Sequence, residues 1–256
     1  MRRVDLNADL GESFGVYTLG DDPALLRVVT SANIACGFHA GDPGTMARAV
    51  SLAVGHGVAL GAHPGLPDLA GFGRRRLEVT PAEVRDLVTY QIGALAGFAA
   101  REGQTLQHVK PHGALYALAE EHPAIAAAIA EAVQEWDRAL ILFGLSGGGL
   151  VAAGKALGLQ TASEVFADRA YSPDGSLVPR SAPDAVLHDP ELVAARMAHW
   201  ARTGTLLAAD GTTALTLAAD TICLHGDSPG ASALAVRVRS VLEAEGVQAQ
   251  SLKCSL

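Results

Sequence analysis

Short apolar segments alternate with helix-start signals along the whole chain, and this alternation is the strongest constraint on its fold. Several of the segments are apolar on both faces, which is typical of parallel strands covered by helices. The predicted strands are Val4–Asn7, Ala32–Gly37, Val58–Ala62, Leu106–Lys110, Ala139–Leu145, Thr161–Phe166 and Thr221–His225. A strand followed by a helix, seven times over, predicts right-handed βα units and an α/β fold.

Five helix starts are marked by an N-cap residue followed by proline, which fits there because its missing N–H would be unpaired anyway. They are Asp22-Pro23, Asp42-Pro43, Thr80-Pro81, Asp189-Pro190 and Ser228-Pro229. Thr80 and Glu83 also have the spacing of a capping box. No linker-like or low-complexity segment interrupts the pattern, so we expect a single domain over residues 1–256.

Two architectures are compatible with repeated βα units: a (β/α) barrel, closed or slightly irregular, and an open doubly wound sheet. Residues capable of chemistry follow nearly every predicted strand rather than gathering at one switch point. This distribution favours an irregular seven-stranded barrel. The segment Asp168–Pro190 is the one long irregular stretch, rich in Pro, Asp and Ser, and we expect it to be an active-site loop.

Composition excludes several classes of protein. Of the 256 residues 49% are hydrophobic, and the mean hydropathy is +0.24, yet no apolar run is long enough for a membrane span. The formal charge is −8 with no basic face, so nucleic acid is not an expected partner. The N-terminus lacks the apolar region of a secretory signal. The cysteines, without a CxxC pair, fit a reducing cytoplasm, which is the expected location.

The residues that come directly after the predicted strands form the candidate site. In a parallel barrel these positions lie at one rim, where catalytic residues are found. The candidates are Asn7, Asp9, Glu12, His39, His63, Lys110, His112, Asp168, His225 and Asp227. Four of them are histidines on different strand ends, each within two residues of glycine or proline, and glycine allows close backbone approach to a ligand. One such histidine is as often structural as functional, but four together indicate a site.

Other polar residues have simpler explanations. Asp42 precedes a proline and is interpreted as a helix cap. Asp5 is solvated or paired inside the barrel, and His108 is structural because it precedes the strand end. The histidines expected at the surface are His56, His122, His188 and His199.

The segment 149–155 has the glycine and lysine spacing of a Walker A loop after a predicted strand. Ala156 stands where serine or threonine should bind Mg²⁺, and the intervening residues have a helical pattern. We therefore expect an ordinary helix with Lys155 in solvent. Ser146 and the glycines that precede this helix offer backbone N–H groups to an anion at its start.

Seven segments, in order across nearly the full length, resemble the LamB/YcsF family. They are DLNADLGE (5–12), NIACGFHAGDP (33–43), GAHPGLPD (61–68), HVKPHGALY (108–116), EVFADRAY (164–171), LVPR (177–180) and HGD (225–227). The chain departs from the usual family residues at Ala8, Leu66 and Ala117, which stand where cysteine, an aromatic residue and asparagine are usual.

The resemblance implies a barrel of the glycoside hydrolase/deacetylase type and a role as the A subunit of a 5-oxoprolinase. In that reaction 5-oxo-L-proline, ATP and water give L-glutamate, ADP and phosphate. ATP is the implied cofactor, and a divalent metal is a candidate, either Mg²⁺ with ATP or an ion in the site. The implied partners are 5-oxoprolinase subunits B and C.

The candidate residues suit such a reaction. A five-membered lactam is a poor electrophile. Phosphorylation of its amide oxygen makes the carbonyl carbon of the ring susceptible to attack by water. Lys110 and Arg180 are the candidate cations for phosphate. Asp9 or a histidine is the candidate base, and Asn7 with backbone N–H groups is the candidate donor to the substrate carboxylate. The other candidates are His39, His63 and His112 for catalysis and Glu12, Asp168, His225 and Asp227 for substrate binding.

Two alternatives remain open from the sequence. One is a metal-dependent deacetylase-type amidohydrolase, with Asp9, His39 and His63 around a metal that activates water. The other is a non-catalytic substrate-binding subunit, although a simple binding pocket is mostly apolar and the predicted rim is densely titratable.

Overall fold

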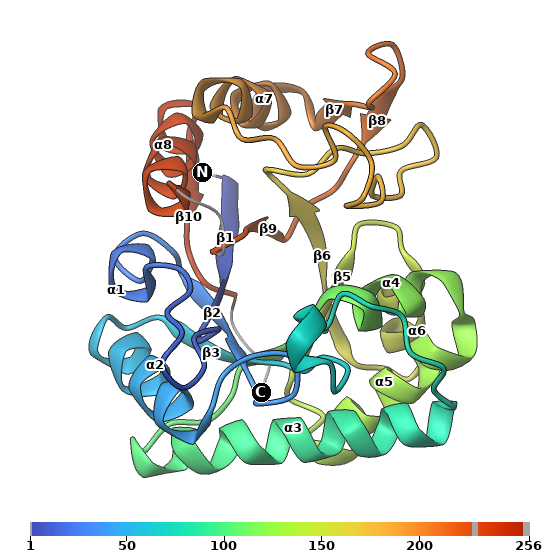
Figure 1. Ribbon diagram of the computed structural model, residues 1–256. Coiled ribbons are helices and arrows are strands. Elements are labelled where there is room, and N and C mark those ends of the chain that lie inside the picture. The colour runs from blue at the N-terminus through green and yellow to red at the C-terminus, as the bar shows by residue number, and fades with distance from the viewer. Residues whose placement is uncertain (1, 227–229, 253–256) are drawn as a thin grey trace.

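Seven parallel strands close into a barrel, which confirms the predicted fold class; the computed structural model describes residues 2–226 and 230–252. The sheet order is β10-β1-β2-β3-β4-β5-β6-β9, and β9 pairs with both β6 and β1, which closes the ring (Figure 1). The ring strands are β1 (Arg2–Leu10), β2 (Ser31–Ala35), β3 (Ala59–His63), β4 (His108–Val109), β5 (Ile141–Leu145), β6 (Gln160–Phe166) and β9 (Thr221–Leu224). Each of them overlaps one of the seven predicted strands.

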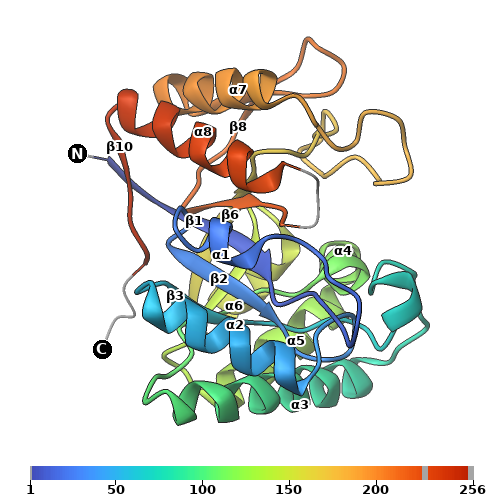
Figure 2. The same cartoon turned by 60° about the vertical axis from the view of Figure 1, so that its left-hand side comes forward.

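Helices surround the ring on its outside, as two views of the chain show (Figures 1 and 2). They are α1 (Asp22–Leu25), α2 (Pro43–Gly55), α3 (Pro81–Arg101), α4 (Gly113–Glu121), α5 (Pro123–Trp136), α6 (Gly149–Ala156), α7 (Pro190–Thr203) and α8 (Ala231–Ala244). No helix within the described residues is long and apolar enough to cross a membrane.

The helix starts follow the predicted capping with one shift. The side chains that cap helices as predicted are those of Asp42, Thr80 and Asp189. Thr80 and Glu83 also form the complete capping box. The prediction for the first helix was wrong by one residue: Asp21, not Asp22, accepts from the backbone of the first turn, so Pro23 is the second helical residue. Ser228 and Pro229 lie outside the described residues.

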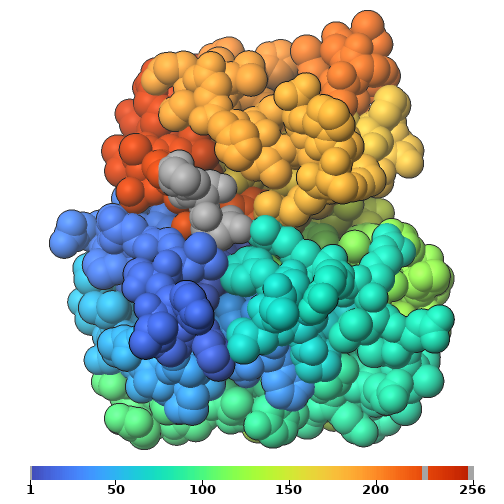
Figure 3. All heavy atoms as spheres, in the orientation of Figure 1, coloured from blue at the N-terminus to red at the C-terminus, as the bar shows by residue number. Residues whose placement is uncertain are grey.

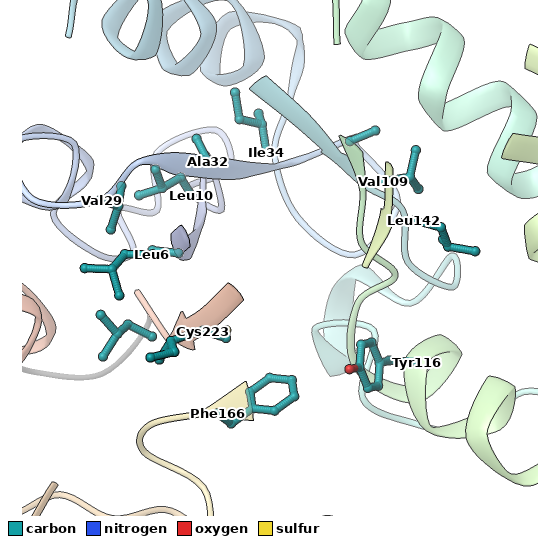
Figure 4. Close-up of a cluster of buried hydrophobic side chains, with 14 of the residues drawn as sticks. Leu6, Leu10, Val29, Ala32, Ile34, Val109, Tyr116, Leu142, Phe166 and Cys223 are labelled. Carbon is teal, nitrogen blue, oxygen red and sulfur yellow. The ribbon is translucent and has the colours of Figure 1, made fainter. Parts of the chain in front are cut away.

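Apolar and polar residues alternate along the first barrel strand, and they lie on opposite faces of it. Leu6 and Ala8 of β1 belong to the apolar layer between strands and helices, and Figure 4 shows Leu6 with Ala32 and Ile34 of β2 in that layer. The intervening residues of β1 are polar and fully or almost fully buried. Because successive side chains of a strand point to opposite faces, these polar residues face the barrel interior.

Three small features were not predicted. Strand β10 (Val247–Ala249) pairs with the first residues of β1, and β7 (Thr205–Leu207) forms an antiparallel pair with β8 (Ala214–Thr216). The short 3₁₀ helix Leu69–Gly71 follows β3. These segments have only three residues each, so their sequence patterns are too short to be distinctive.

Candidate active site

A buried polar network fills the barrel interior and leads to its carboxyl end. Asn33 of β2 donates to Asn7 Oδ1 at 2.7 Å and to Asp9 Oδ1 at 2.9 Å, both on β1. His108 Nε2 donates to Asn33 Oδ1 at 2.8 Å. Asp5, below them on β1, accepts from Ser31 and neighbouring hydroxyl groups and is fully buried, so it is paired inside the barrel. Neighbouring strands thus hold the polar side chains in fixed positions.

Lys110 follows β4 and lies at the top of this network. Its Nζ lies 2.8 Å from Asp9 Oδ1, 2.9 Å from Cys223 Sγ, and 3.3 Å from both Asn7 Oδ1 and Glu164 Oε1. Burial disfavours the ammonium, yet the charge of Asp9 and further acidic neighbours raise the pKa of Lys110 well above its usual value. The lysine is therefore a permanently charged group with anionic partners.

Asp9 is charged for the same reasons. Burial favours its neutral form, but the neighbouring His63 and then Lys110 hold the pKa of Asp9 well below its usual range. His63 Nε2 lies 3.4 Å from Asp9 Oδ2, on the side of the carboxylate away from Lys110. Asp9 thus joins the lysine to a group of histidines.

Three histidines and one glutamate form a cluster beside this pair. His112 Nδ1 lies 3.0 Å from His63 Nε2, and the rings of His39 and His112 stack with centroids 3.8 Å apart. Glu12 Oε1 lies 3.5 Å from His39 Nε2 and 3.7 Å from His112 Nδ1. One ligand-type atom from each of the four residues lies within 4.8 Å of the other three, and all four are buried. These residues could hold a metal ion.

Two glycines make room for the cluster. A Cβ atom at Gly65 would lie 2.5 Å from His39 Nδ1, and one at Gly73 would lie 2.6 Å from His39 Cβ and 3.0 Å from His112 Cδ2. Gly73 also has φ +62°, a conformation that other residues rarely adopt. The loop after β3 can therefore pack directly on the imidazole rings only because glycine occupies both positions.

Asp168 and His225 form a second dyad at the rim, where β6 and β9 end. His225 Nδ1 lies 2.8 Å from Asp168 Oδ1, and the His225 backbone N–H donates to Asp168 Oδ2. Burial opposes ionisation, but His225 lowers the pKa of Asp168. A carboxylate accepts only, so Nδ1 carries the hydrogen and the lone pair is on Nε2, as in an aspartate-oriented base.

Three arginines gather around the mouth of the barrel. Burial and then repulsion from Arg180 lower the pKa of Arg169 to about 10, and Arg74 acts in the same direction. Arg180 also contributes to the lowered pKa of Asp168. Arg180 belongs to the loop after β6 and Arg74 to the loop after β3, and Figure 3 shows these two segments facing each other, gold against teal. The arrangement provides positive charge for an anionic ligand.

The structure brings most of the predicted site residues together, and their roles stay predictions. Those assembled at or near the rim are Asp9, Glu12, His39, His63, Lys110, His112, Asp168, Arg180 and His225. Asn7 differs: both hydrogens of its amide are engaged inside the barrel, with Glu164 and Thr221, so it does not reach the mouth. The predicted metal triad also differs, since Glu12 rather than Asp9 groups with the histidines. Asp227 lies outside the described residues.

Sequence reasoning missed several members of the network. Glu164 accepts from Tyr116 and from Asn7, and Cys223 contacts Lys110. The signal for Glu164 was present, because it is a charged residue in the middle of an otherwise uncharged strand. Tyr116 lies in α4 and Cys223 looks apolar, so neither carried a signal.

The Walker-like segment and the surface histidines behave as predicted. Residues 149–156 are helix α6 with Lys155 exposed, and the four histidines expected at the surface are exposed. The backbone N–H groups at the start of α6 do bind an anionic group, but it is the Glu120 carboxylate of this chain, which accepts from Gly149 N and Leu150 N and fills the position.

Comparison with known proteins agrees with this geometry. Residues 4–255 match the model of the LamB/YcsF family. A protein of Bordetella pertussis, named as the A subunit of 5-oxoprolinase, is 53% identical, covering 97% of this chain and 98% of its own length. One of the same name from Methylococcus capsulatus is 55% identical, with 98% and 96% covered. The crystal structure of a lactam utilization protein from Thermus thermophilus superposes with a TM-score of 0.92 at 46% identity, covering 98% of this chain and all of that one.

Proposed function

Since this chain belongs to the LamB/YcsF family, we propose that it is the A subunit of an ATP-dependent 5-oxoprolinase and that its barrel mouth opens the lactam ring of 5-oxo-L-proline. The observation that carries this proposal is the buried Lys110–Asp9 ion pair, flanked by the Asp168–His225 dyad. A charged donor, a carboxylate and an oriented imidazole are the groups that amide hydrolysis needs.

The substrate is an anion, and the arginines offer its binding site. The carboxylate of 5-oxoproline pairs with Arg180, on the loop after β6, with Arg74 opposite. A guanidinium matches a carboxylate through two parallel hydrogen bonds. This contact directs the lactam ring toward the end of the barrel.

The lactam oxygen then approaches Lys110. A thiol is a weak hydrogen-bond acceptor. A substrate oxygen therefore replaces Cys223 Sγ as a partner of Lys110 Nζ at little cost, while Asp9 keeps its contact. The ammonium stabilises negative charge that develops on this oxygen when the ring carbon is attacked, or on a phosphate attached to it.

His225 is the proposed base that takes a proton from the attacking water. Atoms of Asp9, Cys223 and His225 lie within 4.8 Å of one another, so the imidazole stands beside the oxygen position just described. Asp168 fixes its tautomer and stabilises the imidazolium formed. The proton is then returned to the ring nitrogen as the C–N bond breaks, which completes the amine of glutamate.

ATP supplies the driving force by phosphorylating the lactam oxygen, with release of ADP. Opening of the ring then leaves this phosphate on the new carboxyl group, and a second water releases it, which gives glutamate and phosphate. Among the described residues the one segment with Walker-like spacing is helix α6, whose N-terminus Glu120 occupies. We therefore expect ATP-coupled turnover to require subunits B and C together with this chain.

Reconstitution tests the proposal. The chain, subunits B and C, and the three together are incubated with 5-oxoproline and ATP, and glutamate and phosphate are measured. Glutamate formed only by the three together, in equal amount to phosphate, is the expected result. Full turnover by B and C without this chain would refute the proposed role, and ATP-independent hydrolysis of simple amides by the chain alone would favour the amidohydrolase alternative.

A further inference from the structure

The turn that follows β6 carries Asp168, and one arginine of the outer helix layer holds this turn. Arg196, on α7, donates from Nη1 to the backbone carbonyl oxygens of Ala167 at 2.9 Å and of Arg169 at 2.7 Å, and it reaches that of Phe166 at 3.5 Å. The residues on both sides of Asp168 are therefore tied to the same guanidinium group. Carbonyl oxygens only accept hydrogen bonds, so the arginine supplies donors that these groups need.

Asp168 itself makes different contacts. Its backbone carbonyl oxygen accepts from Leu187 N at 2.8 Å, and its carboxylate accepts from both Nδ1 and the backbone N–H of His225, at 2.8 and 3.2 Å. Hydrogen bonds weaken steeply when their distance and angle change. A carboxylate that meets two groups of one residue at once thus tolerates little movement of its own backbone, and the geometry of the dyad depends on the geometry of the turn.

The Arg196 side chain is a costly group to place there. Among the described residues it has no carboxylate partner: its hydrogen bonds all go to backbone oxygens, and its buried Nη2 makes none. Burial lowers the pKa of Arg196, and the nearby Tyr171 and Asp168 act against this shift. Taking a guanidinium out of water costs free energy, so a neutral side chain would fill this space at a lower cost.

The rest of the loop after β6 has a support of its own. Arg169 donates to the carbonyl oxygens of Val178 at 2.6 Å and of Ala185 at 3.1 Å, which joins two distant parts of this loop. These contacts involve no residue of α7. Loss of the Arg196 guanidinium should therefore loosen the turn that carries Asp168 and leave the remainder of the loop in place.

We propose that Arg196 is a positioning residue of the active site, which holds the turn after β6 so that the Asp168 carboxylate can orient His225. Its guanidinium contacts the backbone of the turn and acts on the reaction only through Asp168. The inference rests on the function proposed above, in which His225 is the base. It gives a role to a largely buried cation that no step of that reaction uses directly.

Kinetics of the reconstituted complex test this role. Arg196→Met removes the guanidinium and keeps most of the apolar stem. We expect kcat for glutamate formation to fall about ten- to a hundredfold, since a displacement of about 1 Å in a catalytic site has effects of this size. The KM for 5-oxoproline should change less than about twofold, because the loop that carries Arg180 stays in place. Arg202→Met, at an exposed arginine of the same helix, is the matched control and should behave as wild type.

A double-mutant cycle decides whether Arg196 acts through Asp168. If it does, Asp168→Asn combined with Arg196→Met should have the kcat of Asp168→Asn alone, because residues that act as one unit are not additive. Losses that multiply in the double variant would overturn the proposal, as would wild-type kcat in folded Arg196→Met. Circular dichroism and thermal unfolding check the fold. Should Arg196→Met not fold, Arg196→Gln, which keeps one donor for the turn, takes its place in the same cycle.

Proton NMR of the isolated chain gives a readout that does not need the reaction. The His225 Nδ1–H, donated to a buried carboxylate, should give a downfield signal that is identified by its absence in Asp168→Asn. We expect this signal to broaden or disappear in Arg196→Met and to persist in Arg202→Met. An unchanged signal in Arg196→Met would overturn the positioning role. A wild-type complex that forms no glutamate would instead contradict the proposed function, and the NMR comparison would still decide whether Arg196 holds the dyad.

Discussion

The ammonium of Lys110 lies 2.8 Å from the carboxylate of Asp9, and the two side chains are only 2% and 7% exposed. Removing one member of a buried ion pair typically costs about 3–5 kcal/mol, because the other charge remains unpaired. The pair therefore limits how its members can be tested: a variant that removes one charge has to be compared with one that removes both.

Lys110→Met keeps the volume of the side chain and removes its charge. We expect it to lower turnover of the reconstituted complex about a hundredfold or more, since one well-placed donor is typically worth roughly 3 kcal/mol in the transition state. Steady-state glutamate formation measures the effect. Lys155→Met, at the exposed lysine of α6, is the matched control and should leave turnover unchanged. Asp9→Asn with Lys110→Met removes both charges and should be folded but inactive. Turnover within a few-fold of wild type in Lys110→Met would remove the lysine from the mechanism.

Asp168→Asn tests the orientation of His225. An asparagine amide can donate to the imidazole, which places the hydrogen on the wrong ring nitrogen. We expect kcat to fall about a hundredfold or more with little change in KM, as expected when general base catalysis is lost. Asp174→Asn, in the exposed part of the same loop, is the control. A change confined to KM would instead assign Asp168 to substrate binding.

Arg180→Gln tests recognition of the substrate carboxylate. A hydrogen bond to a charged group is typically worth about 1.5–3 kcal/mol, so KM for 5-oxoproline should rise roughly ten- to a hundredfold. The value of kcat should change much less, because this contact is made in both the ground state and the transition state. Arg138→Gln, at an exposed arginine, should have wild-type KM. An unchanged KM in Arg180→Gln would place the carboxylate elsewhere.

His108 should make stability depend on pH below about 6.5. Burial and then the charge of Lys110 lower the pKa of His108 to about 3, and its Nδ1 has no acceptor within the described residues. Between about pH 3 and 6.5 the unfolded chain binds a proton that the native state does not, so this contribution to stability falls as the pH decreases through that window. Its slope is at most about 1.4 kcal/mol per pH unit.

Denaturant unfolding of wild type and His108→Gln at several pH values measures this contribution. The glutamine variant keeps a donor for Asn33 and has no titrating ring, so its free energy of unfolding should fall less steeply on acidification. Parallel curves for the two proteins would contradict the assignment.

Gly61→Ala should disrupt the barrel interior. A Cβ atom at this position would overlap the His108 ring, which is held between Asn33 and Phe143. Since a well-packed interior relaxes only partly, we expect a loss of about 1–3 kcal/mol or more. Gly97→Ala is the opposite control: it lies in α3 with open space around it and should stabilise the chain by up to about 1 kcal/mol. Thermal unfolding compares the two, and equal melting temperatures would show that the interior accommodates the methyl group.

The sequence predicted the ring and most of the rim because local patterns were strong. Apolar runs located the seven strands, and residues such as Asp42 and Thr80 located helix starts through capping that depends only on nearby atoms. The polar contacts inside the barrel were harder to predict from the sequence. The sequence alone left open whether Asp5 is solvated or paired. The structure buries it with three hydroxyl partners from distant segments.

Contacts between distant residues explain what was missed. Glu12, rather than Asp9, groups with all three histidines, and Asp9 instead forms its ion pair with Lys110, about a hundred residues away. The involvement of Glu164 and Cys223 depends on strand registers such as Glu164↔Thr221. Neither relationship is encoded in spacing along the chain.

The pairing of β1 with β9 also determines when the molecule can become compact during its synthesis. Asp5 pairs with Thr221, so β1, the first barrel strand to leave the ribosome, cannot complete its pairing until β9, one of the last strands, has been synthesised. Until then the charged interior stays open to water and the ring has two unpaired edges. Contacts of such long sequence separation slow folding and expose the growing chain to aggregation. Truncated products that end before β9 should therefore be targets for chaperones and proteases rather than partly active proteins.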